Sequence, residues 1–270
     1  MQDTLTFTVL GEDKRLFYTA EALRSLGHDV VCSTERLADS DILLLPVPVS
    51  RDGVTVNTAD IRLDFLASAV RRDCRVFCGM PKPEVSDLFF KRGIRLYDYA
   101  AREEFAVRNA VPTAEGVAEI LLHTLPITLR GAHIFITGYG RCARASARLF
   151  TAMGARVTVA ARRCSALAMA SADGYRSLYL RELSRHIAEA DAVVNTVPAV
   201  VLGEPTLCAM RRSCPIVEIA SAPYGVDPAL AKKYGITVIP APSLPGKVAP
   251  KTAGIIIADT VLNILREGSE

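Results

Sequence analysis

The chain has 270 residues, half of them hydrophobic, and a formal net charge of +3. This length suits two domains or one large one, and so small a charge does not favour nucleic acid or an anionic membrane as a partner. No apolar run reaches the length of a membrane span, and the N-terminus lacks the charged-then-apolar pattern of a signal peptide.

The cysteines indicate a reducing compartment and no metal site. They are odd in number and scattered, mostly in apolar contexts: Cys32, Cys74, Cys78, Cys142, Cys164, Cys208 and Cys214. We therefore expect free thiols and a cytoplasmic protein. Their spacing is not that of metal ligands, and no histidine pair supports them.

The first hundred residues alternate between short apolar runs and helical patterns. The expected strands are 5–10, 28–32, 41–46, 74–78 and 94–97. Helices are expected from the turn at 11–13 to about residue 26, at 59–72 and at 84–91. Five strands alternating with helices predict a small doubly wound parallel-sheet domain of the flavodoxin-like kind, which we assign to residues 1–125.

The first turn of this domain, GEDKR at 11–15, has two acids that would repel a pyrophosphate, so we expect it on the substrate side. Arg15 could bind a substrate carboxylate in bidentate fashion, because its guanidinium is planar. The alternative, an ion pair between Arg15 and Asp13, is equally favoured.

A helix over 112–123 is expected to connect the domains. Pro112 and Thr113 would begin it, and Glu115 would lie in its first turn. Glu115 and His123 are therefore candidate proton acceptors near the domain boundary. Glu218, inside an apolar strand, is a third candidate or a hydrogen-bonded structural acid.

A phosphate-binding turn marks the second domain, residues 126–250. Residues 133–143 read HIFITGYGRCA. Gly138 allows a tight turn, Gly140 lets the backbone approach a pyrophosphate, and Ala143 takes the third small position before a helix to Met153. This pattern predicts a Rossmann domain, although the same turn could have lost its ligand.

The following strand, RVTVAARR at 156–163, bears on the cofactor. NAD-specific domains place an acid about 20 residues after the glycine turn, to bind the ribose 2′-hydroxyl. Here the strand ends in Arg162 and Arg163, which could instead bind a 2′-phosphate. We predict NADP, with NAD still open. The alternative is that both arginines are solvated.

Further strands are expected at 192–196, 216–220 and 237–239. Ligands of such sheets lie at the carboxyl ends of the strands. That rule selects eleven candidate cofactor-binding residues: Gly138, Tyr139, Gly140, Arg141, Arg162, Arg163, Asn195, Thr196, Pro198, Ala220 and Ser221.

The C-terminal region reads APSLPGKVAPKTAG at 241–254, which predicts a loop rich in proline and glycine. A helix over 252–267 follows, and we expect it to pack back on the first domain. The loop would then lie at the hinge, beside a cleft between the domains. Lys247 and Lys251 are candidate site residues there, because an otherwise apolar loop has little structural use for two lysines.

Six segments together resemble the family of the dipicolinate synthase A subunit of spore-forming bacteria. They are VPTAEG, GYGRCA, AARR, NTVPA, EIASAPYGVD and, most specifically, LPGKVAPKTAG. The last is also similar to a loop of alanine dehydrogenases, which are two-domain enzymes. The resemblance implies oxidation of a cyclic dicarboxylate, 4-hydroxy-tetrahydrodipicolinate or its dehydrated form, to pyridine-2,6-dicarboxylate in the mother cell during sporulation. It also implies a flavoprotein-like partner, the B subunit of the same synthase.

The implied chemistry is loss of water, then loss of hydride to a nicotinamide. The candidate catalytic residues are Glu115, His123 and Lys247. The candidate substrate-binding residues are Asp13, Arg15, Ser50, Thr113 and Lys251. Two alternatives stay open: another amino-acid or hydroxy-acid dehydrogenase, and a nucleotide-binding protein without catalytic activity. The oligomeric state is open too, with a homo-oligomer as one option.

Overall fold

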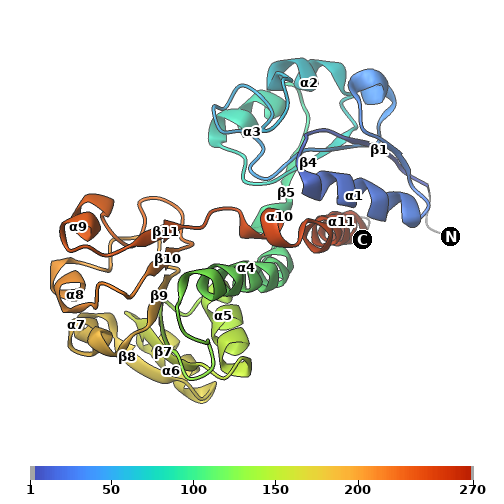
Figure 1. The fold of residues 1–270 in the computed structure, drawn as a ribbon. Coiled ribbons are helices and arrows are strands. Elements are labelled where there is room, and N and C mark those ends of the chain that lie inside the picture. The colour runs from blue at the N-terminus through green and yellow to red at the C-terminus, as the bar shows by residue number, and fades with distance from the viewer. Residues whose placement is uncertain (1–3, 269–270) are drawn as a thin grey trace. The chain divides into compact units, whose positions relative to one another are not determined.

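The computed structural model describes residues 4–268, which fold into two compact units (Figure 1). The first combines the residues up to Asn109 with those from Ala249 onward. The second is Ala110–Val248. Each unit has its own parallel sheet. No helix of the described residues is both long enough and apolar enough to cross a membrane.

The first unit is built on a five-stranded parallel sheet. Its strands are β1 (Thr6–Val9), β2 (Asp29–Val31), β3 (Ile42–Leu44), β4 (Arg75–Cys78) and β5 (Leu96–Asp98). They are ordered β2-β1-β3-β4-β5, with Phe7 of β1 paired to Val30 and Ile42. This is the flavodoxin-like order, as predicted.

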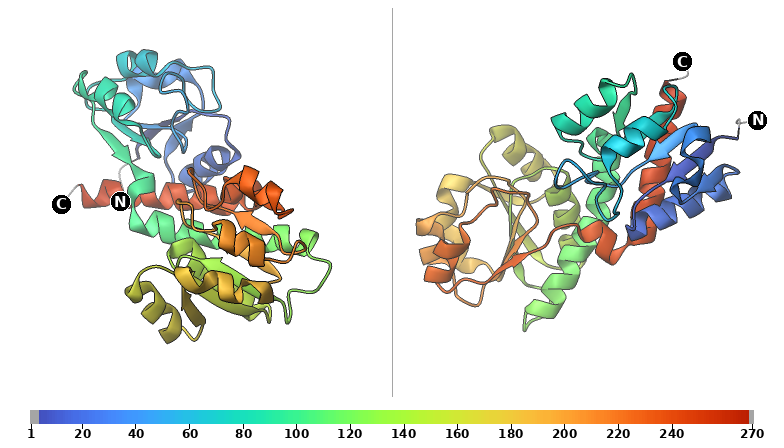
Figure 2. Two further views of the ribbon diagram at one scale, coloured as in Figure 1. Left: turned by 90° about the vertical axis from the view of Figure 1, so that its left-hand side faces the viewer. Right: turned by 90° about the horizontal axis from the view of Figure 1, so that it is seen from above.

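Helices cover both faces of this sheet (Figure 2). They are α1 (Lys14–Ser25), α2 (Leu63–Ala69), α3 (Pro83–Phe90) and α11 (Pro250–Glu267), with short 3₁₀ turns at Thr34–Asp39 and Tyr99–Ala101. Phe7 and Leu44 pack with α1 and α11, whereas the alternate residues Leu43 and Val76 pack with α2 and α3. Both faces are apolar because both are buried.

The last helix packs against α1, although the two are far apart in the sequence. Thr19 donates a 3.0 Å hydrogen bond from Oγ1 to the carbonyl oxygen of Gly254. A Cβ added at Gly254 would overlap the backbone of α1 at Arg15. Glycine at this position therefore allows the close approach of α11 to α1.

The second unit is built on a six-stranded parallel sheet. Its strands are β6 (His133–Thr137), β7 (Arg156–Ala161), β8 (Arg176–Tyr179), β9 (Ala192–Asn195), β10 (Ile216–Glu218) and β11 (Val238–Pro240). They are ordered β11-β10-β9-β6-β7-β8. This is the Rossmann order, in which β6–β8 and β9–β11 form two mononucleotide-binding halves.

The helices of this unit also cover both faces. They are α5 (Arg141–Ala152), α6 (Cys164–Ala172), α7 (Leu183–His186), α8 (Glu204–Ala209), α9 (Pro228–Lys233) and α10 (Leu244–Val248), with 3₁₀ turns at Leu180–Glu182 and Ile187–Glu189. Ile134 and Val194 pack with α5 and α6, and Phe135 and Val193 pack with α7 and α8. The long α4 (Glu103–Thr124) runs from the first unit into the second.

Two local expectations were wrong. Helix α4 begins at Glu103, and Pro112 lies inside it. Proline starts many helices, but packing can also hold it in a helix interior, and Pro112 is buried. The predicted loop 241–254 contains α10, and α11 begins at Pro250. Here proline occupies the first turn of a helix, which needs no N–H donor at that position.

Candidate dinucleotide-binding site

The turn between β6 and α5 has the backbone geometry that its glycines predict. Gly138 has a φ of 85°, in the left-handed region that favours glycine. Its N–H donates to the carbonyl oxygen of Ala160 at 2.8 Å. A Cβ added at Gly138 would lie 2.7 Å from Oγ1 of Thr196. Gly138 thus fixes a tight turn against the end of β9.

Gly140 is open to a ligand. It is the N-cap of the twelve-residue helix α5, and no atom lies within 4 Å of a Cβ built on it. The first amides of a helix attract anions, through both their free N–H groups and the helix dipole. The turn therefore fits the pyrophosphate of a nicotinamide dinucleotide. The pyrophosphate would lie in the space that a side chain at position 140 would fill. Arg141 follows as the exposed first residue of α5.

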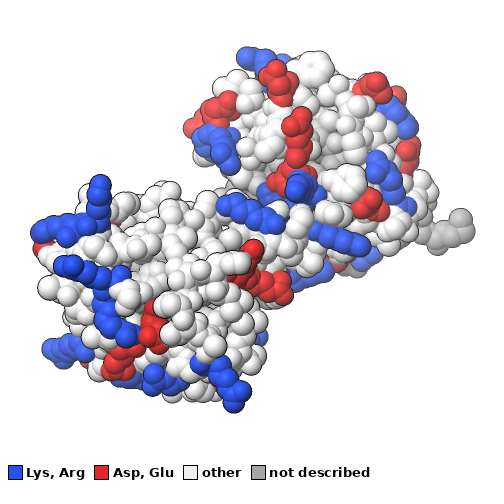
Figure 3. All heavy atoms as spheres, in the orientation of Figure 1, with Lys and Arg blue, Asp and Glu red and all other residues white. Residues whose placement is uncertain are grey.

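The end of β7 is cationic. Arg162 and Arg163 are both exposed, and Arg163 is the N-cap of α6. Ala161 pairs with Tyr179 at the end of β8, and the Arg181 guanidinium carbon lies 4.4 Å from the centre of the Tyr179 ring. Three arginines thus follow two neighbouring strands. On the face drawn in Figure 3, basic side chains stand in small groups with acidic and uncharged ones between them.

The other predicted cofactor residues follow β9 and β10, on the second mononucleotide half. Pro198 and Ser221 are exposed. Thr196 donates from Oγ1 to the carbonyl oxygen of Thr137 at 2.8 Å. Asn195 is fully buried, and its amide bonds to other protein groups. A bound cofactor would therefore meet Thr196 and Ser221 rather than the Asn195 side chain.

Three further predicted site residues lie on α4 and α10, two helices that pack together in the second unit. Thr113 of α4 shares a side-chain hydrogen bond with the thiol of Cys142, in the first turn of α5. A Cβ added at Gly116 would lie 3.0 Å from Leu244, so α10 packs directly on α4. The structure therefore brings Thr113, Glu115 and the helix that carries Lys247 to one side of the Rossmann sheet. Glu115 and Lys247 are exposed.

His123 lies further away along the same helix. It is exposed in the last turn of α4, eight residues after Glu115. At about 1.5 Å of rise per residue, the two side chains start roughly 12 Å apart. They do not converge on one reacting atom.

In the first unit, Arg15 pairs with Asp13. Asp13 caps α1 by accepting the Arg15 N–H at 2.9 Å, and its carboxylate also accepts from Nε and Nη2 of Arg15. Nη2 also donates to the carbonyl oxygen of Val47 at 2.7 Å. Burial alone would raise the pKa of Asp13, but the hydrogen bonds and charge of Arg15 lower it below the usual value. The ion pair between Arg15 and Asp13, one of the two roles expected for Arg15, is therefore present, and Nη1 takes no part in it.

Two other predicted substrate residues lie in the first unit. Ser50 is buried in a turn, where Oγ donates to Asp52 and accepts the N–H of Gly53, both at 2.9 Å. Its hydroxyl thus already has a partner in each direction. Lys251 is exposed in the first turn of α11.

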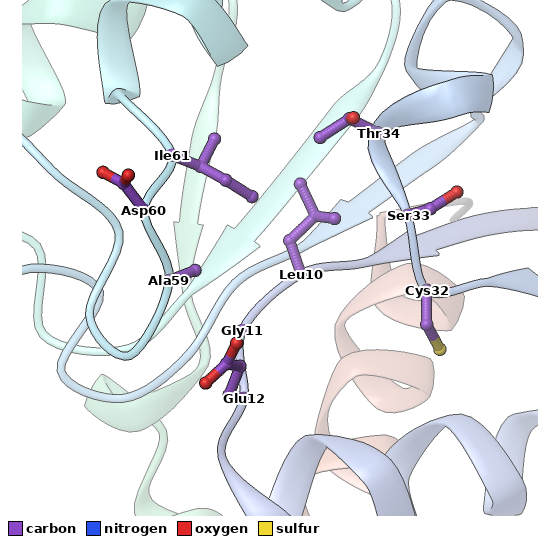
Figure 4. Close-up of a pocket in the computed structure, with 9 residues that line it drawn as sticks. All are labelled: Leu10, Gly11, Glu12, Cys32, Ser33, Thr34, Ala59, Asp60 and Ile61. Carbon is purple, nitrogen blue, oxygen red and sulfur yellow. The ribbon is translucent and has the colours of Figure 1, made fainter.

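A hollow of about 380 Å³ opens in the first unit, beyond the carboxyl ends of β1 and β2. Its walls are Leu10–Glu12, Cys32–Thr34 and Ala59–Ile61. Figure 4 shows the side chains of Leu10 and Ile61 pointing toward one another. Glu12 and Asp60 are its charged residues, so it does not suit a dicarboxylate. The described residues contain no cluster of three or more metal-ligating side chains.

The sequence matches known proteins over most of its length. The A subunit of dipicolinate synthase from Bacillus subtilis (strain 168) is 31% identical over 232 residues, which are 84% of this chain and 78% of that protein. The chain belongs to the dipicolinate synthase A-subunit family. The family's N-terminal domain matches residues 32–100. The NAD-binding domain of D-isomer specific 2-hydroxyacid dehydrogenases matches residues 106–234.

Solved structures agree with this family. The A subunit of dipicolinate synthase from Bacillus halodurans superposes with a TM-score of 0.88 at 26% identity, over 97% of this chain and 99% of that one. An L-alanine dehydrogenase superposes with a TM-score of 0.68 at 14% identity, over 97% and 89% of the two chains, which is a likeness of fold. The family resemblance and the two-domain α/β class are confirmed. The chain is a dehydrogenase with a nicotinamide-binding domain.

One buried acid, Glu218, has hydrogen-bond partners that the sequence alone does not reveal. Glu218 ends β10 and is 4% exposed. Its Oε1 accepts from Nδ2 of Asn195 at 2.6 Å and from the N–H of Ala220 at 3.0 Å, and its Oε2 accepts from the N–H of Gly225 at 2.8 Å. In the sequence, the only sign of this role is that an acid stands inside an apolar strand. Its partners become visible only once β9 and β10 are paired.

Proposed function

We propose that this member of the dipicolinate synthase A-subunit family is an NADP-dependent dehydrogenase that forms pyridine-2,6-dicarboxylate. Its substrate is 4-hydroxy-tetrahydrodipicolinate, or the dihydrodipicolinate that this compound gives on losing water. The observation that carries the proposal is the open glycine turn at Gly138 and Gly140, in a chain 31% identical to a dipicolinate synthase protein.

The reaction balances when one nicotinamide is reduced for each substrate ring that is oxidised. Loss of water gives dihydrodipicolinate, and loss of one hydride and one proton from that ring gives the aromatic product. The nicotinamide, when bound, supplies the hydride acceptor. The chain must hold the ring, exclude water and accept the proton.

Glu115 is the residue we assign to the proton. It lies two residues after Thr113, which bonds to the first turn of α5, and it is exposed. His123, about two turns further on, would serve only a separate step. The dicarboxylate needs cations, and we assign Lys247, Lys251 and Nη1 of Arg15 to it, with Thr113 as a hydroxyl donor. Asp13 would act through Arg15, which it orients.

The preference for NADP rests on Arg162 and Arg163. Both are exposed where a ribose 2′-substituent lies in Rossmann domains, and no acid stands there to bind a 2′-hydroxyl. Paired guanidinium groups suit a phosphate. We further propose, from the family, that the flavoprotein-like partner assists in the mother cell of a sporulating bacterium, and that the chain could form a homo-oligomer.

One other function has support of its own. The match of residues 106–234 to hydroxyacid dehydrogenases also fits a dehydrogenase of small hydroxy acids. The test is an assay of the purified chain with enzymatically generated 4-hydroxy-tetrahydrodipicolinate, in parallel with a panel of hydroxy acids and amino acids, each with NADP and NAD. Addition of the flavoprotein-like partner to half of the samples separates a missing partner from a wrong substrate. Turnover of a hydroxy acid alone would replace the proposal.

A further inference from the structure

The buried side chains of Asn195 and Glu218 bond to the loops that follow β9 and β10. Glu218 accepts hydrogen bonds from backbone donors at both ends of the loop that follows β10: Ala220 at one end and Gly225 at the other. One carboxylate therefore fixes the span of six residues from 220 to 225. Residues 221–224 are exposed, with Tyr224 at a φ of 66°.

Asn195 joins this loop to the neighbouring strand. Its Nδ2 donates to Oε1 of Glu218 at 2.6 Å and to the carbonyl oxygen of Val197 at 3.0 Å, while its Oδ1 accepts the hydroxyl of Thr137. Thr137 is the last residue of β6, directly before Gly138. The ends of β6, β9 and β10 are thus connected through three side chains, those of Thr137, Asn195 and Glu218.

Gly225 packs directly against Asn195 and also bonds to the loop after β9. A Cβ added at Gly225 would overlap the side chain of Asn195. The carbonyl oxygen of Gly225 accepts from the N–H groups of Val201 and Leu202, both at 2.9 Å. The loop after β9 and the loop after β10 are therefore held in one position relative to each other.

We propose that Glu218 and Asn195 are positioning residues that preorganise these two loops for the nicotinamide half of the cofactor. In a Rossmann sheet, each half binds one mononucleotide of the cofactor. The first half binds the adenosine side, so the second half, here β9–β11, would bind the nicotinamide side. The inference rests on the nicotinamide-binding function. It adds that the adenosine half is bound independently of this network.

Binding of half cofactors tests the proposal. The affinities of NADPH and NADH are compared with those of their adenosine fragments, adenosine 2′,5′-bisphosphate and AMP. In Glu218→Gln, the amide nitrogen faces a backbone N–H, so one of the two backbone donors loses its acceptor. We expect the Kd of the preferred reduced cofactor to rise about tenfold, and that of its adenosine fragment to change less than about twofold.

A second variant perturbs the same network, and a control variant lowers stability elsewhere. Gly225→Ala displaces Asn195 without removing any polar group, and should give the same split. Leu207→Ala, at a buried core position within α8, lowers stability without changing the network, and should leave the ratio of the two affinities unchanged. Hydrogen exchange at the amides of Ala220 and Gly225 should accelerate in both network variants.

The outcomes separate the two claims. Equal weakening of whole cofactor and fragment, or no weakening of either, would overturn the positioning role. A wild-type chain that binds neither reduced cofactor would overturn the nicotinamide site itself, and the positioning role with it.

Discussion

Tyr139 donates a 2.6 Å hydrogen bond from its hydroxyl to Oδ2 of Asp173, 34 residues further along the chain. The ring is buried in the core of the second unit, and the Arg144 guanidinium lies 5.9 Å from its centre. Burial raises the pKa of Tyr139, and the hydrogen bond with Asp173 raises it further. The middle residue of the glycine turn therefore contributes its backbone to the site and its side chain to the fold.

Tyr139→Phe should separate these two contributions. Loss of one hydrogen bond should lower the free energy of unfolding by about 1 kcal/mol. The Kd for NADPH should stay within about twofold of wild type, because the backbone of the turn is unchanged. Urea denaturation and nicotinamide fluorescence measure the two effects. A large loss of affinity at unchanged stability would show that the hydroxyl contacts the ligand.

The two glycines of the turn should respond in opposite ways. Gly140→Asp places a carboxylate in open space at the N-terminus of α5, so the fold should tolerate it while NADPH binding weakens at least about tenfold. Gly138→Ala forces a φ of 85° on alanine and crowds Thr196, so it should cost about 1–3 kcal/mol of stability. Thermal melts and binding titrations on both variants check this. The reverse pattern would contradict the placement of the pyrophosphate.

The arginines after β7 should decide between the two cofactors. In the double variant Arg162→Ser and Arg163→Ser, loss of two charge-assisted contacts should raise the Kd for NADPH about a hundredfold. The Kd for NADH should be nearly unchanged. Arg185→Ser, which also removes an exposed arginine of this unit, is the control. If both cofactors weaken equally, the arginines do not read the 2′-phosphate.

The sequence carried most of the framework of the site. The strands around Ile134, Val193 and Val217 were predictable because buried parallel strands are short and apolar, with glycine turns between them. The register of these strands and the order in which they lie side by side could not be predicted from the sequence. Whether Glu218 is a base or a structural acid depends on which strand lies beside β10, and that is a long-range property.

The misplaced elements show where local rules fail. Pro112 reads as a helix start, but buried packing holds it in the interior of α4. The proline- and glycine-rich stretch around Lys247 reads as a loop, but contact of Leu244 with Gly116 accompanies a short helix there. Strand β8 and helix α6 were not identified from the sequence. In these places tertiary contacts outweigh the local preference.

The pair of Asp13 and Arg15 predicts a dependence of stability on pH. The pKa of Asp13 is lowered in the folded state, so the pair stabilises the fold above the usual carboxyl pKa, and the stabilisation is lost as the pH falls through the lowered pKa. Arg15→Met should therefore cost about 2 kcal/mol at neutral pH and less in acid, because it leaves a mostly buried carboxylate unpaired.

Arg62→Met is the matched control, because Arg62 and Asp64 form an exposed pair with the same two-residue spacing. An exposed pair contributes little, so the loss should stay below about 1 kcal/mol. Denaturation of both variants at neutral and acid pH gives the comparison. Equal losses in the two variants would mean that burial does not strengthen the Asp13 pair.

The most direct measurement is the stoichiometry of one reaction under anaerobic conditions. The chain receives 4-hydroxy-tetrahydrodipicolinate and NADP, and reduced nicotinamide and pyridine-2,6-dicarboxylate are quantified in the same sample. A dehydrogenase of the proposed kind gives one reduced nicotinamide for each pyridine dicarboxylate, faster with NADP than with NAD. Formation of the pyridine dicarboxylate without nicotinamide reduction, or of neither product in the presence of the flavoprotein-like partner, would contradict it.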